Sequence, residues 1–206
     1  MKHQRAKHPI FVAVSGTGRL LSHLLTVESH HSYSVVGVVT SHPNCQAVTI
    51  ADKKHIPVFS GDFPRVVNQP KTAATIQNIE SSEIHGFYQR YQPVLTVLAG
   101  FIRPFPFDEE WPALNIHPSL LPKYSGVGFY GSKVHQAVIA SDDVVSGASC
   151  HWVSEEYDQG EILSQVVVPR LFDDNEYTLA ARVFKSEKKL LPTSIDLALK
   201  VVISKS

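Results

Sequence analysis

The chain has 206 residues, of which 43% are hydrophobic, and its 19 basic side chains balance its 19 acidic ones. That length and composition are typical of one soluble domain with a sizeable core. The balanced charge argues against recruitment of nucleic acid or an anionic membrane by an overall field, and no run approaches the roughly 18 apolar residues of a transmembrane helix. The two cysteines, Cys45 and Cys150, do not have the spacing of a disulfide framework, which favours reduced thiols. We therefore expect a soluble, cytoplasmic protein, without nucleic-acid or membrane partners, that folds as a single domain over residues 1–206.

Strand-like and helix-like segments alternate along the chain, after a flexible N-terminal tail expected at residues 1–9. Short apolar runs predict strands at Ile10–Val14, Val35–Thr40, Pro57–Phe59, Pro93–Leu98 and Pro112–His117. Helical spacing predicts helices at Arg19–Ser29, Asn44–His55, Thr75–Gln92 and Ser132–Ile139. Gly61–Thr72 is interpreted as a loop, Gly147–Val153 and Ile162–Val168 as a hairpin, and Asp173–Lys189 as a helix that resumes after Pro192 toward Val202. This order predicts an α/β fold, with a Rossmann-like, mostly parallel sheet, flanking helices and a C-terminal β-hairpin.

The segment Leu114–Gly126 contains two polar residues at the end of a predicted strand. Alternation places Asn115 and His117 on one face of the strand, and Pro118 ends it, so the pair lies at the carboxyl edge of the sheet. Open α/β sheets carry their active sites at that edge. In a second interpretation, which stays open, Asn115 caps a turn and His117 is a hydrogen-bonded core histidine.

A glycine-rich turn, Gly16-Thr17-Gly18, lies between the first strand and the first helix. Unpaired backbone N–H groups at the start of a helix favour an anion such as phosphate. The dinucleotide fingerprint G-x-G-x-x-G is incomplete because Leu21 occupies its last glycine position. We therefore predict neither NAD nor FAD at this turn.

Asp158, in the predicted tip of the hairpin, supplies the third group of a possible site. A histidine titrating near neutrality can move a proton, an amide can donate to an oxyanion, and a carboxylate can orient the imidazole. Asn115, His117 and Asp158 would together suit attack of an amine on an acyl carbon without a covalent intermediate. Taken alone, Asp158 near Gly160 is typical of a turn. Ser119 lacks the G-x-S-x-G context of a serine hydrolase.

A loop with aromatic residues, Ala99–Trp111, follows the strand Pro93–Leu98. Its rings Phe101, Phe105 and Phe107 either cover the hydrophobic core or line a flat apolar pocket at the edge of the sheet. The 11 histidines form no H-E-x-x-H motif and no Cys/His pairing with zinc-ligand spacing. We predict no metal site.

The sequence resembles the phosphoribosylglycinamide formyltransferase family of folate-dependent formyltransferases over roughly residues 10–192. The motifs are Leu-Asn-Ile-His-Pro-Ser-Leu-Leu-Pro-Lys-Tyr at 114–124, Leu-Ala-Gly-Phe-Ile-Arg at 98–103, and Tyr-Asp-Gln-Gly-Glu-Ile at 157–162. Asn-x-His-Pro-Ser-Leu-Leu-Pro is highly specific to this group of enzymes. The resemblance implies a formyltransferase fold and transfer of a formyl group from the co-substrate 10-formyltetrahydrofolate to the amine of glycinamide ribonucleotide, in de novo purine biosynthesis.

The resemblance also implies roles for individual residues. Asn115, a protonated His117 and Asp158 would be catalytic. The implied binding residues are Gly16, Thr17 and Gly18 for the substrate phosphate, Glu187 for the ribose, and Ile102, Arg103, Phe105, Glu155, Glu156 and Tyr157 for the folate. Where the family usually has Ser-Asn after the glycine turn, this sequence has Arg19-Leu20. A guanidinium suits phosphate well, so Arg19 joins the phosphate-binding candidates, whereas Leu20 offers nothing to an anion.

Alternatives remain within the same resemblance. The chain could be another folate-dependent N-formyltransferase, a formyl-folate hydrolase, or a catalytically weak folate-binding paralogue. A methionyl-tRNA formyltransferase is disfavoured because it has an additional C-terminal domain and a basic surface for tRNA. A chain of 206 residues with no net charge is expected to have neither. The expected partners are small-molecule substrates, and the expected assembly is a monomer or a homodimer.

Overall fold

The computed structural model describes residues 6–63, 83–106, 108–126 and 128–205, and the chain divides into two compact units. Unit 1 comprises residues 1–114 and 195–206, and unit 2 comprises residues 115–194. The strands follow the order β3-β2-β1-β4-β5-β6-β7. This is a mixed, mostly parallel sheet that ends in an antiparallel pair, so the predicted α/β fold class is confirmed. The expectation of a single domain stays a prediction.

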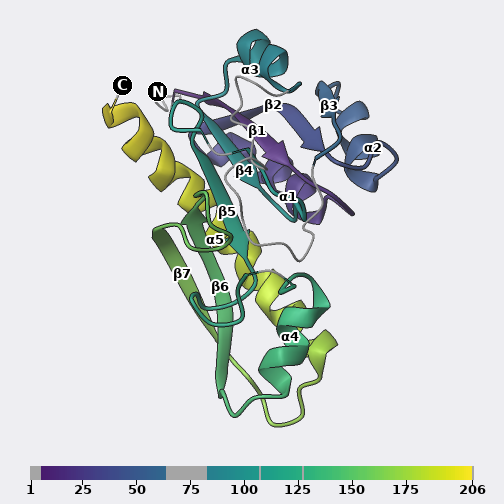
Figure 1. Cartoon of the computed structure of the whole chain (residues 1–206), viewed down its shortest axis with the longest axis vertical. Helices are drawn as coiled ribbons and strands as arrows, with labels where there is room; N and C mark the ends of the chain where they lie inside the picture. The colour runs from purple at the N-terminus through teal and green to yellow at the C-terminus, as the bar shows by residue number, and fades with distance from the viewer. Residues whose placement is uncertain (1–5, 64–82, 107, 127, 206) are drawn as a thin grey trace. The chain divides into compact units, whose positions relative to one another are not determined.

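Unit 1 contains the first four strands and the helices between them (Figure 1). Its elements are β1 (His8–Ala13), α1 (Arg19–Val27), the short 3-10 helix η1 (Glu28–His30), β2 (Tyr33–Thr40), α2 (Gln46–Asp52), β3 (Val58–Ser60), α3 (His85–Tyr91) and β4 (Leu95–Leu98). β1 pairs in parallel with β2 and β4, and β2 with β3. Residues Ile10–Ala13 of β1 are fully buried, as expected of a central parallel strand covered on both faces.

Unit 2 is built around the hairpin of β6 (Val145–Trp152) and β7 (Ile162–Pro169), which pair antiparallel. It also contains α4 (Ser132–Ile139), which matches its predicted bounds, and the first part of α5 (Glu176–Lys205). β5 (Ala113–His117) begins in unit 1 and ends in unit 2 with the residues Asn115 to His117. The predicted hairpin and its long tip are therefore confirmed.

Three boundaries differ from the sequence expectation or lie outside the described residues. β1 begins at His8, so His8 and Pro9 belong to the strand rather than to a flexible tail. The loop predicted over 61–72 and the helix predicted over 75–92 lie largely outside the described residues, and within the second range the structure describes only the helix α3 (His85–Tyr91). Within the described parts of the chain, no helix is both long and apolar enough to cross a membrane.

The last helix, α5, differs most from expectation because it runs without a break past Pro192. Proline removes one backbone hydrogen bond and typically costs a helix interior about 3 kcal/mol. The buried neighbours Leu191 and Ile195 offset that cost by packing. The helix also starts later than predicted, at Glu176, because the Asn175 side chain accepts hydrogen bonds from the backbone N–H groups of residues 177 and 178.

Candidate active site

The end of β5 brings Asn115 and His117 to one side of the strand, as the predicted alternation requires. Both side chains approach the carboxylate of Asp158, whereas the alternating residues Leu114 and Ile116 are buried in the core. After Pro118 the chain turns back, so that the backbone of Tyr124 lies against the His117 ring. The three predicted catalytic residues therefore meet within unit 2.

Each ring nitrogen of His117 faces an oxygen atom, and one of the two makes a hydrogen bond. Its Nε2 lies 2.8 Å from the carbonyl oxygen of Tyr124. Because a carbonyl can only accept a hydrogen bond, Nε2 carries the proton in the neutral ring and donates it to this oxygen. The other nitrogen, Nδ1, lies 3.7 Å from Asp158 Oδ2, and the two side chains are only 6% and 5% exposed. The nitrogen that can accept a proton thus faces a buried carboxylate.

Asp158 lies in the tip between β6 and β7, with a left-handed backbone conformation at φ 54°. Aspartate tolerates this region better than most residues. Its Oδ2 accepts a hydrogen bond of 2.9 Å from the Gly126 backbone, and its Oδ1 lies 3.5 Å from Asn115 Nδ2. Asp158 is therefore both a turn residue and a neighbour of the polar pair on β5, and the two sequence interpretations are compatible.

A second histidine, His151 on β6, belongs to the same cluster, and the sequence analysis missed it. Its Nδ1 lies 3.0 Å from the Trp152 carbonyl oxygen and therefore carries the proton. Its Nε2 accepts a hydrogen bond of 3.0 Å from Asn115 Nδ2 and lies 3.6 Å from Asp158 Oδ1. These contacts orient the Asn115 carboxamide, because its NH₂ group must face His151 and Asp158.

A break in strand register accompanies His151. The pairing of β6 with β7 shifts between Cys150 and His151, and such bulges commonly re-aim a side chain beside an active site. The available sequence signal was a single histidine in the mostly apolar run Gly147–Val153. That signal does not reveal which group the histidine contacts.

Burial and neighbouring charges set the protonation states. Burial is the main cause that lowers the pKa of His117 below its ordinary value, and the nearby charge of Asp158 only partly opposes it. Burial would raise the pKa of Asp158, but the neighbouring His151 and His117 rings and the hydrogen bond from the Gly126 backbone outweigh it and lower that pKa. At neutral pH the site therefore holds a neutral His117 beside an ionised Asp158. The protonated His117 that the family resemblance implies must gain its proton during the reaction.

The lowered pKa of His117 predicts acid sensitivity of the fold. Below pH 6.5, the ordinary histidine value, the unfolded chain binds a proton that folded His117 resists, so the free energy of unfolding falls as the pH falls. We expect His117→Gln, which keeps a side-chain N–H for the Tyr124 carbonyl, to show a shallower fall than the unmodified protein. Urea unfolding between pH 7 and pH 5 measures both slopes, and identical slopes would contradict the assignment. The ionised Asp158 stabilises the fold at neutral pH. It adds to the fall in the free energy of unfolding only at lower pH, as the pH drops through its lowered pKa.

The predicted phosphate-binding turn, Gly16 to Arg19, lies in unit 1 between β1 and α1. Gly18 adopts φ 66° at the start of α1, where no side chain caps the helix, and Gly16, Thr17 and Arg19 are exposed. The next residue, Leu20, is buried in the core. An apolar side chain suits this buried position, and Leu20 is not available to an anion.

The loop after β4 also belongs to unit 1 and is joined to the phosphate turn. Ser15 donates its backbone N–H to the Gly100 carbonyl, and its hydroxyl oxygen accepts from the Ile102 backbone at 3.1 Å. The Ile102 side chain is 46% exposed, and Arg103 Nε is buried without a hydrogen-bond partner among the described residues. Phe105 is 4% exposed.

The buried Phe105 ring packs with two other phenylalanine rings of unit 1. Phe63 and Phe101 meet edge to face with centroids 4.9 Å apart, and the Phe105 centroid lies 6.2 Å from Phe63 and 5.6 Å from Phe101. The sequence left two interpretations of this aromatic loop open. Phe101 and Phe105 are buried and cover the hydrophobic core, as the first of them predicted. The third ring, Phe107, lies outside the described residues.

The remaining predicted binding residues lie in unit 2. In the hairpin tip, Glu155 and Glu156 are exposed and Tyr157 is partly buried. Glu187 on α5 is buried. The pKa of the nearby Cys150 thiol is raised to about 12, mainly because the thiol is buried and also because of the charge of Glu187. Among the described residues, no group of three or more His, Cys, Asp or Glu side chains is arranged to hold a metal ion.

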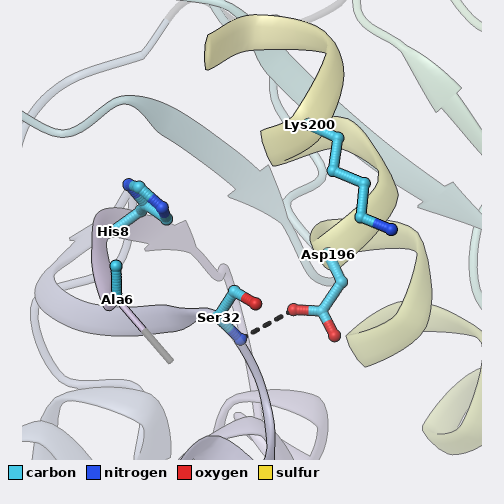
Figure 2. Close-up of a pocket in the computed structure, with 5 residues that line it drawn as sticks. All are labelled: Ala6, His8, Ser32, Asp196 and Lys200. Carbon is cyan, nitrogen blue, oxygen red and sulfur yellow. Dashed lines mark hydrogen bonds between the residues drawn. The ribbon is translucent and has the colours of Figure 1, made fainter. Parts of the chain in front are cut away.

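A hollow of about 380 Å³ elsewhere in unit 1 contains none of the predicted site residues (Figure 2). It is lined by Ala6, His8, Ser32, Asp196 and Lys200. Asp196 accepts a hydrogen bond from the Ser32 backbone and pairs with His31, each at 2.8 Å. Both carboxylate oxygens are therefore already used to join α5 to the turn before β2.

The fold and the polar cluster together define a class of protein. Residues 8–195 match the model of the formyl transferase family, and the chain belongs to that family. Within it, the chain is similar to the chloroplastic phosphoribosylglycinamide formyltransferases of Vigna unguiculata and Arabidopsis thaliana, at 35% and 34% identity over 91% of this chain. These matches cover 59% and 63% of those relatives' own length. The resemblance expected from the sequence motifs is confirmed.

Solved structures agree with this assignment. The fold matches glycinamide ribonucleotide transformylase 1 from Symbiobacterium toebii with a TM-score of 0.76 and 25% identity, covering 97% of this chain and 90% of that one. It matches the phosphoribosylglycinamide formyltransferase from Brucella melitensis with a TM-score of 0.72 and 26% identity, covering 92% and 94%. The likeness therefore extends over nearly the whole chain.

Proposed function

We propose that this chain transfers the formyl group of 10-formyltetrahydrofolate to the primary amine of glycinamide ribonucleotide. The amine nitrogen attacks the formyl carbon, a tetrahedral oxyanion forms, and the bond from that carbon to N10 of the folate then breaks. N10 gains a proton and the amine loses one, so the products are tetrahydrofolate and the formylated amide. The observation that carries this proposal is the buried His117–Asp158 pair, in which the basic nitrogen of a neutral imidazole faces a carboxylate.

Each member of the cluster suits one part of this reaction. His117 Nδ1 can take the proton that the attacking amine loses and later supply one to the leaving nitrogen. Asp158, ionised beside it, stabilises the cationic imidazole while the proton resides there. Asn115 already donates to His151 at 3.0 Å, whereas its contact with Asp158 is a long 3.5 Å. The hydrogen of that longer contact is the one available to an oxyanion.

Substrate binding is proposed for the groups named by the family resemblance. The turn of Gly16, Thr17, Gly18 and Arg19 would bind the phosphate, because it offers a helix start and a guanidinium. Glu187 would contact the ribose. Ile102, Arg103 and Phe105, with Glu155, Glu156 and Tyr157, would bind the folate. The exposed Ile102 side chain supports that role, as does Arg103 Nε, which has no hydrogen-bond partner within the described part of the chain. The buried Phe105 ring would support the loop from behind.

Replacing Arg19 with alanine is expected to raise KM for glycinamide ribonucleotide by roughly 10-fold or more, the usual effect of losing a charged hydrogen bond. KM for 10-formyltetrahydrofolate should change little. Steady-state kinetics with each substrate varied in turn measures both constants. Lys54→Ala, which removes an exposed positive charge near the end of α2, is the matched control. Equal increases in both KM values would exclude Arg19 as the phosphate contact.

The function itself is tested by mixing the purified chain with 10-formyltetrahydrofolate and following its deformylation by absorbance, with and without glycinamide ribonucleotide. Turnover that depends on the acceptor supports the proposal. Turnover without the acceptor would instead identify a formyl-folate hydrolase. Binding of folate without turnover would identify a folate-binding paralogue or an enzyme for another amine.

We also propose that the chain works in the cytoplasm. Cys45 and Cys150 are both unpaired thiols, as is usual in a reducing compartment. Fractionation of the source cells tests this proposal, and recovery of the chain in an organelle, such as the one named for the chloroplastic relatives, would contradict it.

A further inference from the structure

Four side chains behind the loop that follows β5 form a connected network, which we call the Tyr124 anchor. Its members are Tyr124, Ser141, Asp143 and Arg170, all in unit 2. The Tyr124 hydroxyl lies 2.7 Å from Asp143 Oδ2 and from Ser141 Oγ. Because a carboxylate only accepts hydrogen bonds, the single phenol proton goes to Asp143. Tyr124 is thereby tied to a charged group that lies outside the catalytic cluster.

Further hydrogen bonds hold the backbone around Ser141 and Asp143 in place. Arg170 Nη1 donates to the carbonyl oxygens of Ser141 and Asp143 at 2.6 and 3.1 Å. The Ser141 hydroxyl accepts a hydrogen bond from the Asp143 backbone N–H at 3.1 Å. The hydrogen bond from Lys123, and after it the one from Tyr124, lower the pKa of Asp143, so its carboxylate is ionised at neutral pH. The segment after α4 therefore offers a rigid, charged acceptor to the tyrosine.

The near side of the network reaches the catalytic groups through the backbone. Tyr124 has φ 55°, a left-handed conformation that is unfavourable for a bulky residue. In this conformation its carbonyl accepts the hydrogen bond from His117 Nε2 at 2.8 Å. Two residues later, the Gly126 N–H donates to Asp158 Oδ2 at 2.9 Å. One short backbone segment thus contacts both the imidazole and its carboxylate.

We propose that Tyr124 and Asp143 are positioning residues, which hold His117 in the tautomer protonated at Nε2 and hold its Nδ1 toward Asp158. The Tyr124 side chain stabilises the strained backbone, and the backbone carbonyl then selects the tautomer. Without the anchor the carbonyl can turn away, and the proton is free to move to Nδ1, where it blocks the nitrogen that must accept the amine proton. The expected effect on kcat rests on the proposed formyl transfer, whereas the expected effect on the tautomer of His117 does not.

The test uses Tyr124→Phe and Asp143→Asn, each of which weakens the anchor while keeping the size of the side chain. The Phe ring also preserves the contact with Phe129, whose centroid lies 6.4 Å from that of Tyr124. Since a small misplacement of a catalytic group can cost about 100-fold, we expect kcat to fall by about 10- to 100-fold in both variants, with little change in either KM. The double variant should be no worse than the more affected single variant.

Lys123→Met is the matched control. Lys123 is 64% exposed and donates to both oxygens of the Asp143 carboxylate, at 2.7 and 3.0 Å, but no hydrogen bond joins it to the Tyr124 hydroxyl. We expect its kcat to equal that of the unmodified protein. A similar loss in Lys123→Met and Asp143→Asn would overturn the proposal, because it would mean that local charge rather than the tyrosine contact matters. A rise in KM with unchanged kcat would also overturn it.

The pH dependence of kcat distinguishes a positioning role of Tyr124 and Asp143 from a merely structural one, which would leave this dependence unchanged. The Tyr124 carbonyl raises the pKa of His117 against the effect of burial, so loosening it should shift the acid limb of kcat to lower pH. The other titratable groups that face this ring are Asp158 of the hairpin tip, His151 of β6 and His135 of α4. None of them is altered in the variants. An acid limb that stays in place would contradict the proposal.

Nitrogen NMR of the histidine side chains separates this inference from the proposed function. In the unmodified protein His117 should be protonated at Nε2, and in Tyr124→Phe it should exchange between the two tautomers. This result is expected even if the chain acts on a different amine or only binds folate. An unchanged Nε2–H signal in the folded variant would overturn the anchor, whereas absence of turnover with a shifted tautomer would count only against the proposed function.

Discussion

Replacing His117 with alanine, or Asp158 with asparagine, is expected to lower kcat for formyl transfer by about 10²- to 10⁴-fold, the usual contribution of a positioned acid–base group. Alanine removes the nitrogen that takes the amine proton. Asparagine keeps the shape of Asp158 and, like aspartate, tolerates φ 54°, but it cannot stabilise a cationic imidazole. KM for either substrate should change much less than kcat, because these interactions act mainly in the transition state.

Initial rates at saturating substrates measure this effect, and far-UV circular dichroism checks that each variant folds. Asp142→Asn is the control for Asp158→Asn, because Asp142 is exposed and lies outside the catalytic cluster. Wild-type turnover in a folded His117 or Asp158 variant would remove that residue from the mechanism.

The second large effect is expected for Gly160→Ala in the hairpin tip. A Cβ atom at Gly160 would lie only 1.7 Å from the carbonyl oxygen of Trp152, far inside any possible contact, so the backbone must move. Overpacking of this kind typically costs about 1–3 kcal/mol, and occasionally more. The displacement would also move Asp158, two residues earlier, and we expect kcat to fall by about 100-fold.

Thermal unfolding and kinetics on the same preparation measure both parts of this effect. Gly86→Ala in α3 is the matched control, because an added Cβ there meets nothing within 4 Å and alanine favours a helix over glycine. We expect that variant to be at least as stable as the unmodified protein. A stable, fully active Gly160→Ala protein would mean that the tip can relax without displacing its aspartate.

Local sequence patterns correctly predicted the elements whose residues interact mainly with near neighbours. The apolar run around Ile10–Ala13 had the composition of a central parallel strand, and these residues are fully buried. The bounds of α4 were predicted without error. At Pro192 the same rules predicted a break that does not occur, because propensity describes an isolated helix whereas packing of Leu191 and Ile195 stabilises this one.

The candidate site was predictable only in part. Asn115 and His117 lie two residues apart on a strand, so their common face follows from alternation alone. His151 was missed because its partner, Asn115, is 36 residues away in the chain. The aromatic loop was ambiguous for a similar reason. Whether Phe105 lines a pocket or covers the core depends on the position of Phe63, which no local pattern reports.

The sequence by itself determined the order of strands and helices, the glycine turn before α1, and the placement of a carboxamide and an imidazole at the end of β5. These features depend on periodicity and backbone preference, which act over a few residues. Only the tertiary structure decided which nitrogen of His117 carries the proton, because the carbonyl that selects it belongs to Tyr124, seven residues away and beyond a turn. Burial of the ring likewise decided that this histidine is neutral at neutral pH, although the charge of Asp158, from the distant hairpin tip, acts in the opposite direction.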